Sequence, residues 1–464
     1  PAEHQARISK FTQQREQLEN EVGRRSQGYY ERADTVTLSS VKAAIPADAV
    51  LVEFAVYRPF DPKQPNESTK NFGDPRYIAY IIPAQGEVRW KDLGAAKGID
   101  AAVDAFRRAL RDPQRHDIKQ LSRALDEKIM QPVRALVGNA THLLVSPDGQ
   151  LDLIPFEALV DPEGRYLIER LSVTYLTTGR DLLRMEVARA SKSGPLVIAD
   201  PAFGESGTAA VAKLDRPGLG RRKVTNKRRS ITTAQDLSDV YFSPLSGTAQ
   251  EARAIQSLFP DAHVLTGLHA SKGALKRIDA PSILHIATHG FFLQDTTESP
   301  SSDQGKPAAN DSRSVRGTAK IENPLLRSGL ALSGANLNKG SSENGILTAL
   351  EASNLNLWGT KLVTLSACDT GLGEVRNGEG VYGLRRAFFL SGAETLVMSL
   401  WPVSDDVTRE MMTTYYTGLK GGMGRGEALH QAELAMLKRK GRQHPFYWAS
   451  FIQSGEWASL DGKK

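Results

Sequence analysis

Two short apolar runs in this chain each end in a residue type that thiol hydrolases use. Residues 362–367 (LVTLSA) precede Cys368, the only cysteine, and residues 282–288 (SILHIAT) precede His289 and Gly290. Such runs, with glycines close behind, predict buried strands of a parallel sheet. Because side chains at the carboxyl ends of parallel strands face the crevice where ligands bind, the two strand ends could bring a thiol and an imidazole together.

A Cys–His pair of this kind would act as a nucleophile and its base. A free thiol titrates at about pH 8.5, so only a small share is thiolate at neutral pH, and a neighbouring imidazole raises that share. The imidazole can also protonate the leaving amine when a peptide bond breaks. Lone cysteines more often serve as small buried hydrophobes, so the position of Cys368 alone does not establish a reactive role.

His285 lies four residues before His289, and in a strand both side chains point to the same face. A metal site would need a third ligand at a recognisable spacing, which the sequence does not supply. We therefore interpret His285 as a core histidine and expect neither a metal nor another cofactor.

These two motifs, together with the segment GEGVYGLRRAFFLSGAETLVMSLWPVSD at residues 378–405, resemble the CHAT family of caspase-like cysteine peptidases, which are relatives of caspases and separases. The resemblance covers roughly residues 40–455 and is sharpest from Ser282 to Asp406. It implies an α/β, caspase-like three-layer fold with a mostly parallel sheet, and a cysteine endopeptidase activity. Cys368 and His289 would form the catalytic dyad. The backbone N–H groups of Gly290 and Cys368 would stabilise the oxyanion.

The same resemblance implies that loops beyond the strand ends form the pocket for the residue before the cut. Those loops carry Asp369, Trp401 and Asp405. Carboxylates there would attract Arg or Lys and repel Asp, so we predict cleavage after a basic residue. Each aspartate could instead cap a loop or form a turn.

With 464 residues the chain exceeds what one core normally supports. We predict a helical segment at residues 1–40, which could end an upstream tetratricopeptide-type or sensor region, and a pseudo-caspase-like domain at 41–203 that has neither a cysteine nor a His-Gly pair. A basic flexible linker at 204–236 follows, and then a catalytic domain at 237–464. At the start of the catalytic domain, Thr248 and Glu251 predict the N-cap and capping-box partner of a helix.

A flexible insertion is predicted at residues 294–322, where Ser, Asp, Gly, Pro and Ala dominate. It is either passively disordered or cut by the enzyme itself. The candidate sites of self-cleavage are Arg313 and Arg316 in the insertion and Arg222 and Arg229 in the linker.

The composition excludes several other classes of protein. The net charge of +6 gathers mainly at residues 216–229, which hold no aromatic residue, so a linker is favoured over a nucleic-acid-binding arm. No run approaches the roughly 18 apolar residues of a membrane span. A single cysteine excludes an internal disulfide framework and fits the reducing cytoplasm, where we expect the protein. No signal peptide is visible, but the chain begins at Pro1 and could be a fragment of a longer protein.

Other functions remain to be weighed against a peptidase. A phosphatase would need an arginine six positions after the cysteine, but the first is Arg376, and no GxxxxGK[ST] nucleotide motif occurs. The stronger alternative is a catalytically inactive scaffold that binds partner proteins. The family resemblance implies bacterial defence or regulated cell death and a protein substrate, for example a gasdermin-like pore former.

Overall fold

The structure is a computed structural model that describes residues 36–62, 71–187, 189–204, 230–231, 241–292, 324–337, 344–367, 374–376 and 380–462. For residues 230–231, 246, 324, 374–376 and 380–382 it describes the backbone alone.

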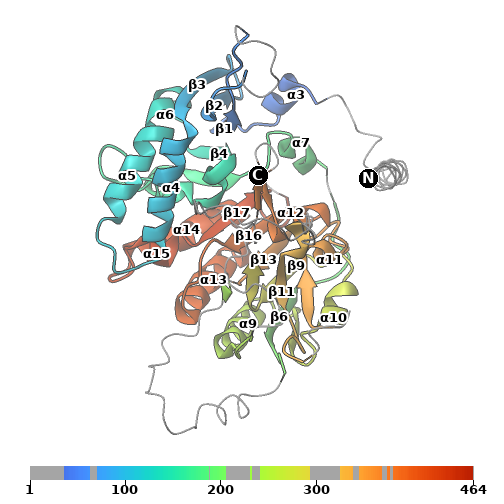
Figure 1. Cartoon of the computed structure of the whole chain (residues 1–464). Helices are drawn as coiled ribbons and strands as arrows, with labels where there is room; N and C mark the ends of the chain where they lie inside the picture. Colours follow the sequence, from blue (N-terminus) through green and yellow to red (C-terminus); the bar gives the residue numbers. More distant parts are fainter. Residues whose placement is uncertain are drawn as a thin grey trace, which may run out of the picture.

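In this described part of the chain, eleven strands form one sheet in the order β3-β2-β1-β4-β5-β17-β16-β13-β9-β6-β8 (Figure 1). Most neighbouring strands are parallel, and only the β1–β2, β2–β3 and β16–β17 pairs are antiparallel. The predicted α/β fold with a mostly parallel sheet is therefore confirmed. The strands are β1 (Ala49–Tyr57), β2 (Arg76–Pro83), β3 (Arg89–Ala95), β4 (His142–Ser146), β5 (Ser172–Tyr175), β6 (Leu196–Pro201), β8 (His263–Gly267), β9 (Ile283–Ala287), β13 (Leu362–Leu365), β16 (Thr395–Ser399) and β17 (Phe451–Gly455).

The antiparallel β16–β17 pair reverses the direction of the sheet near its middle. As a result, the carboxyl ends of β9 and β13 lie at one edge of the sheet, while those of β1 and β4 lie at the opposite edge. Strand β6 precedes the predicted linker at 204–236 but lies between β8 and β9, which follow it. The proposed domain boundaries stay a prediction, and the sheet itself runs without a break across them.

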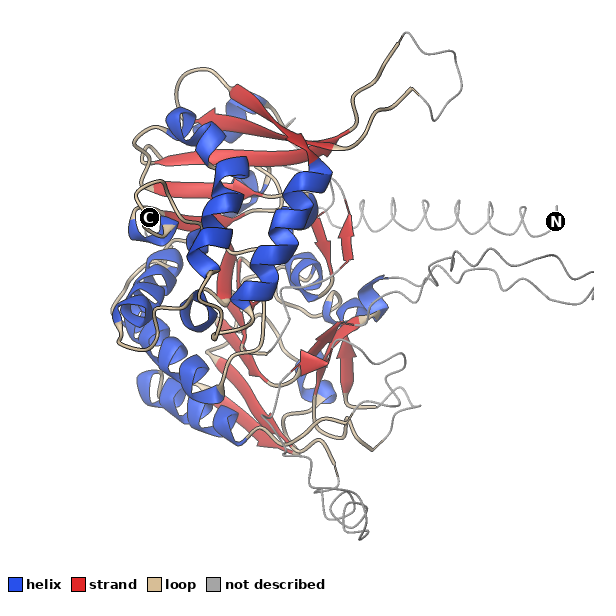
Figure 2. Ribbon diagram, turned by 60° about the vertical axis from the view of Figure 1, so that its left-hand side comes forward, coloured by secondary structure: helices blue, strands red, loops and turns tan. Residues whose placement is uncertain are grey.

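Helices cover both faces of this sheet (Figure 1 and Figure 2). Successive side chains of β1 point to opposite faces of the sheet. Val50, Val52 and Phe54 pack in the main core with α4 and α5, whereas Leu51 packs with Val41 of α3 and Leu182 of α7. The helices are α3 (Leu38–Ala43), α4 (Ala96–Leu110), α5 (Ile118–Ile129), α6 (Gln131–Val137), α7 (Asp181–Met185), α9 (Ser246–Leu258), α10 (Lys272–Lys276), α11 (Ala349–Ala352), α12 (Leu384–Leu390), α13 (Asp405–Lys420), α14 (Arg425–Lys438) and α15 (Pro445–Trp448), with 3-10 turns η1 (Gly149–Leu153), η2 (Phe156–Ala158), η3 (Leu167–Glu169) and η5 (Pro324–Leu326). None of the helices described is long and apolar enough to cross a membrane.

A second, small sheet follows directly after β9. It has the order β12-β11-β10-β7, with β7 (Ser230–Ile231), β10 (Gly290–Phe292), β11 (Ser328–Ala331) and β12 (Ile346–Thr348). A two-stranded hairpin, β14 (Glu374–Arg376) and β15 (Gly380–Tyr382), lies between β13 and α12 in the sequence.

The predicted cap of α9 is wrong. The helix begins at Ser246, and its N-cap position is Leu245, so Thr248 lies inside the first turn. The Thr248 hydroxyl donates a 2.7 Å hydrogen bond to the Leu245 carbonyl and accepts one of 3.0 Å from the Asp200 amide. Glu251 contacts His285 instead of forming a capping box.

Candidate active site

His289 lies between the end of β9 and the start of β10, and only 2% of it is exposed. Strand β11 fixes this turn, because the Ala331 amide donates to the His289 carbonyl at 2.9 Å and the Thr288 hydroxyl donates to the Ala331 carbonyl. The backbone that carries the imidazole is therefore held by the small sheet as well as by the large one.

The His289 ring is oriented by a backbone carbonyl. Its Nε2 lies 2.7 Å from the carbonyl oxygen of Ser243. A carbonyl can only accept a hydrogen bond, so Nε2 carries the hydrogen. In the neutral ring Nδ1 then carries the lone pair and is the atom that can accept a proton.

Two aromatic rings flank the imidazole. The ring centroids of Phe203 and Phe242 lie 5.2 Å and 5.7 Å from that of His289. Both phenylalanines belong to a small apolar cluster with Phe291 of β10 and Ala331 of β11. Packing of this cluster restricts the ring to one orientation.

Cys368, the proposed nucleophile, lies outside the described residues, but the strand that leads to it is well defined. The Ser366 amide donates to the Ile286 carbonyl of β9 at 2.9 Å, and the Ser399 hydroxyl of β16 donates to the Ala367 carbonyl at 2.5 Å. The chain is thus tied to both neighbouring strands up to Ala367. Asp369 and the proposed self-cleavage sites Arg222, Arg229, Arg313 and Arg316 also lie outside the described residues.

Trp401 and Asp405, the other two residues of the predicted substrate pocket, pack against other parts of the fold. Trp401 is 2% exposed in the main core, and its Nε1 donates to the Phe446 carbonyl at 3.1 Å. Asp405 is in the first turn of α13 and packs so closely on α9 that a methyl group at Gly247 would lie 2.2 Å from its Oδ2. The hydrogen bond and ring contacts described for His289 are with Ser243, Phe203 and Phe242.

His285 is a core histidine, as its position predicts. It is fully buried, its Nδ1 lies 3.0 Å from the Tyr416 hydroxyl, and its Nε2 lies 3.1 Å from Glu251 Oε1. The Tyr416 hydroxyl donates to Thr364 Oγ1 at 3.0 Å, so the network joins β9, β13, α9 and α13. Within the described ranges, no three His, Cys, Asp or Glu side chains gather as metal ligands would.

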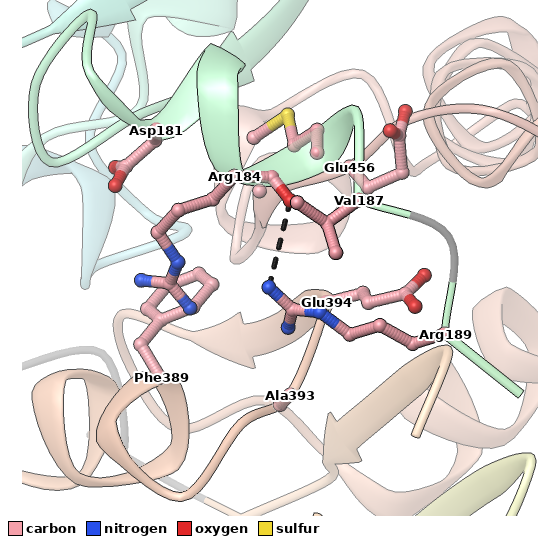
Figure 3. Close-up of a pocket in the computed structure, with 10 residues that line it drawn as sticks. Asp181, Arg184, Val187, Arg189, Phe389, Ala393, Glu394 and Glu456 are labelled. Atoms are coloured by element: carbon pink, nitrogen blue, oxygen red, sulfur yellow. Dashed lines mark hydrogen bonds between the residues drawn. The ribbon is translucent and has the colours of Figure 1, made fainter. Parts of the chain in front are cut away.

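A small cavity lies at the edge of the sheet opposite to His289, between α7 and the amino end of β16 (Figure 3). Its volume is about 30 Å³, enough for about two water molecules. Arg189 lines it and donates to the Arg184 carbonyl at 3.5 Å and to the Gly392 carbonyl at 3.3 Å. The cavity lies away from His289 and so takes no part in the candidate site.

Sequence reasoning did not single out Ser243 and Asn336, which the structure links to His289 through hydrogen bonds. Ser243 acts through its carbonyl, which every residue has, so no sequence signal could identify it. Asn336 holds the segment that carries Ser243, and its role depends on contacts between residues 94 positions apart.

Comparison with known proteins adds the following findings. The family model described as the CHAT domain matches residues 119–456. Human tetratricopeptide repeat protein 28 is 25% identical over 328 residues, and the mouse protein of the same name is 22% identical over 326 residues. Each match covers 70% of this chain, which spans only 12% of either relative.

Two solved structures match the chain at low similarity. The Saccharomyces cerevisiae separase–securin complex matches with a TM-score of 0.44 and 8% identity, covering 90% of this chain and 30% of that chain. The Arg-specific cysteine proteinase gingipain R matches with a TM-score of 0.36 and 9% identity, covering 78% of this chain and 74% of that chain.

Proposed function

Because the chain belongs to the CHAT domain family, whose model matches most of its length, we propose that it is a cysteine endopeptidase with a Cys368–His289 dyad. The expectation of this family from sequence is confirmed; the activity and the substrate are our proposal.

The register of β9 and β13 is the observation that carries the proposal. The two strands pair in parallel with Ile283 opposite Leu362 and Ile286 opposite Leu365, a constant offset of 79 residues (362 − 283 = 365 − 286 = 79). If this offset continued past the strand ends, the position level with His289 would be 368, which is the cysteine. Neighbouring strands lie about 4.8 Å apart, so strand ends at the same level would bring thiol and imidazole within reach of each other.

The proposed reaction uses the tautomer that Ser243 selects. His289 Nδ1 takes the proton of the thiol, and the thiolate attacks the carbonyl carbon of the scissile bond. The imidazolium then protonates the leaving amine as the C–N bond breaks, leaving a thioester that water hydrolyses. The Ser243 carbonyl stabilises the imidazolium through its hydrogen bond with Nε2. The backbone N–H groups of Gly290 and Cys368 would bind the oxyanion.

We propose cleavage after Arg or Lys, with Asp369 as the preferred partner of the basic side chain. Asp405 is the less favoured choice because it packs against α9, and Trp401 would contribute only through packing because it is buried. Self-cleavage at Arg222, Arg229, Arg313 or Arg316 belongs to the same proposal, because these sites have the basic residue that the pocket would select.

The proposed partners are a protein substrate, for example a gasdermin-like pore former in a bacterial defence or cell-death setting, and a tetratricopeptide-type region. We propose the tetratricopeptide-type region because the relatives are tetratricopeptide repeat proteins. We place this activity in the cytoplasm.

The proposed dyad is tested by measuring the rate at which iodoacetamide alkylates Cys368 as a function of pH. Because Cys368 is the only cysteine, the rate reports on one thiol. We expect wild type to react at pH 6 about tenfold or more faster than a free thiol, since the imidazole stabilises the thiolate. His289→Gln should remove this advantage, while the exposed His116→Gln should retain it.

Cleavage of fluorogenic peptides with Arg, Lys, Leu or Asp before the cut measures activity and preference together. We expect turnover of the Arg and Lys peptides and none with Cys368→Ala. An ordinary thiol pH profile, combined with a Cys368→Ala protein that matches wild type in every assay, would instead support the inactive scaffold.

A further inference from the structure

Asn336 makes a pair of hydrogen bonds with one backbone position. Its side-chain oxygen accepts from the Phe242 amide at 3.0 Å, and its side-chain nitrogen donates to the Phe242 carbonyl at 2.9 Å. The Asn336 backbone amide also donates to the Phe203 carbonyl at 2.7 Å. One residue therefore fixes the backbone of both phenylalanines that flank His289.

The position of Phe242 determines what this pair controls. Phe242 is followed directly by Ser243, whose carbonyl lies 2.7 Å from His289 Nε2. The N–H and C=O of Phe242 belong to the two peptide units on either side of its Cα, so Asn336 holds both units and restricts the direction in which the chain enters Ser243. The same bonds hold the backbone of Phe242, whose ring centroid lies 5.7 Å from that of the imidazole.

Asn336 also lies close in sequence to the strand that pairs with the element after His289. It follows β11, whose Ala331 amide binds the His289 carbonyl, and β11 pairs with β10 directly after His289. The imidazole and the side chain that holds its acceptor are thus attached to one small sheet.

From these contacts we infer that Asn336 is a positioning residue, which orients the Ser243 carbonyl and thereby sets the tautomer of His289. The inference rests on the proposed function in so far as it assigns His289 a catalytic role. The uncharged amide suits this place because it presents an acceptor to the Phe242 N–H and a donor to the Phe242 C=O at once, whereas a carboxylate has no donor.

The test uses Asn336→Asp, which has the same shape but turns an oxygen toward the Phe242 carbonyl, and Asn336→Ser, which removes the pair without adding charge. Asn354→Asp is the matched control, because Asn354 is exposed and donates to the Leu350 carbonyl at the surface. Urea midpoints of all variants establish that each is folded.

The first readout is the imidazole ¹⁵N–¹H spectrum of protein labelled at its nine histidines. The His289 signal is the one lost in His289→Gln. We expect an Nε2–H tautomer in wild type and in the control, and a mixed or shifted tautomer in both Asn336 variants. A purely structural role would lower stability without moving this signal. An unchanged His289 signal in both folded Asn336 variants would overturn the inference.

The second readout is the pH profile of Cys368 alkylation. We expect the rate at pH 7 to fall about tenfold or more in Asn336→Asp, in the range usual for losing a group that orients a functional histidine. If His289→Gln does change the alkylation profile, an equal profile in wild type and both Asn336 variants would also overturn the inference. If the proposed dyad is wrong, His289→Gln will leave the alkylation rate unchanged. The tautomer spectrum would still test the role of Asn336.

Discussion

The guanidinium of Arg385 lies 3.7 Å from the carboxylate of Asp152, and both side chains are almost completely buried. Asp152 belongs to η1 in the first half of the chain, and Arg385 lies in the first turn of α12, directly after the β14–β15 hairpin. That hairpin also contacts η1. The segment that follows Cys368 in the sequence is therefore anchored on the first half of the chain, which gives the half without a cysteine a structural role.

Replacing Arg385 by Met should be strongly destabilising. It leaves Asp152 buried without its cation, and removing one partner of a buried pair typically costs about 3 kcal/mol. Burial raises the pKa of Asp152 to about 7, so the loss should be larger at pH 8 than at pH 6. Urea unfolding at pH 7 measures the free energy of unfolding. The Arg385→Met/Asp152→Asn double variant should recover most of the loss, because no charge is then left without a partner. A single variant as stable as wild type would show that the pair contributes nothing.

The sequence was sufficient to locate the two strand ends because local patterns encode them. Short apolar runs with glycine close behind became β9 and β13, and His285 became a buried core residue. The direction reversal at β16–β17 was not predictable, because it depends on where the last strand of the chain inserts. No local pattern specifies such a pairing between distant segments.

The side-chain surroundings of His289 were also beyond local reasoning. Its hydrogen-bond acceptor is a backbone carbonyl 46 residues away, and a carbonyl has no sequence signature. Asp405 was assigned to the substrate pocket from its place after a strand, yet it contacts α9, because helix packing decided its surroundings.

Tyr415 and Tyr416 allow a matched test of the buried network around His285. Both are fully buried, but only the Tyr416 hydroxyl is bonded, to His285 and Thr364, whereas the Tyr415 hydroxyl has no hydrogen-bond partner among the residues described. Tyr416→Phe should lower the free energy of unfolding by about 1–3 kcal/mol, since it leaves two buried polar groups without a partner. Tyr415→Phe should be neutral or slightly stabilising. Urea unfolding gives the free energy of unfolding of both variants. Equal losses of stability would contradict the assignment of the network.

Stability should fall as the pH rises, because of a buried pair of carboxyl groups. Burial raises the pKa of Glu157 to about 7 and that of Glu433 well above its ordinary value, and Tyr175 donates a 2.6 Å hydrogen bond to Glu157. With both pKa values raised, the folded state holds protons that the unfolded chain releases above about pH 4.5. This contribution is fully present below that pH and is lost as the pH rises through 7.

Glu433→Gln removes one of these titrations. We expect the variant to be about 1–2 kcal/mol more stable than wild type at pH 8 and close to it at pH 5. Glu87→Gln, at an exposed position, should leave the pH dependence unchanged. Urea unfolding at pH 5, 6, 7 and 8 gives the comparison, and a Glu433→Gln protein with the wild-type slope would contradict it.

Gly329 connects backbone packing to the proposed active site. It lies in β11 opposite Phe291 of β10, and a methyl group added there would be 2.5 Å from the Leu347 carbonyl oxygen and 2.8 Å from the Phe291 ring. Gly329→Ala should therefore separate these strands and cost about 1–3 kcal/mol of stability. Because β10 begins directly after His289, the pH profile of Cys368 alkylation should shift as well.

Gly98→Ala is the matched control, since a methyl group at this position of α4 would meet no atom within 4 Å. Alanine favours the helix over glycine, so this variant should be stabilised by about 0.5–1 kcal/mol with an unchanged alkylation profile. A Gly329→Ala protein that is destabilised but keeps the wild-type alkylation profile would mean that the His289 turn is held by β9 and Ser243 without help from the small sheet.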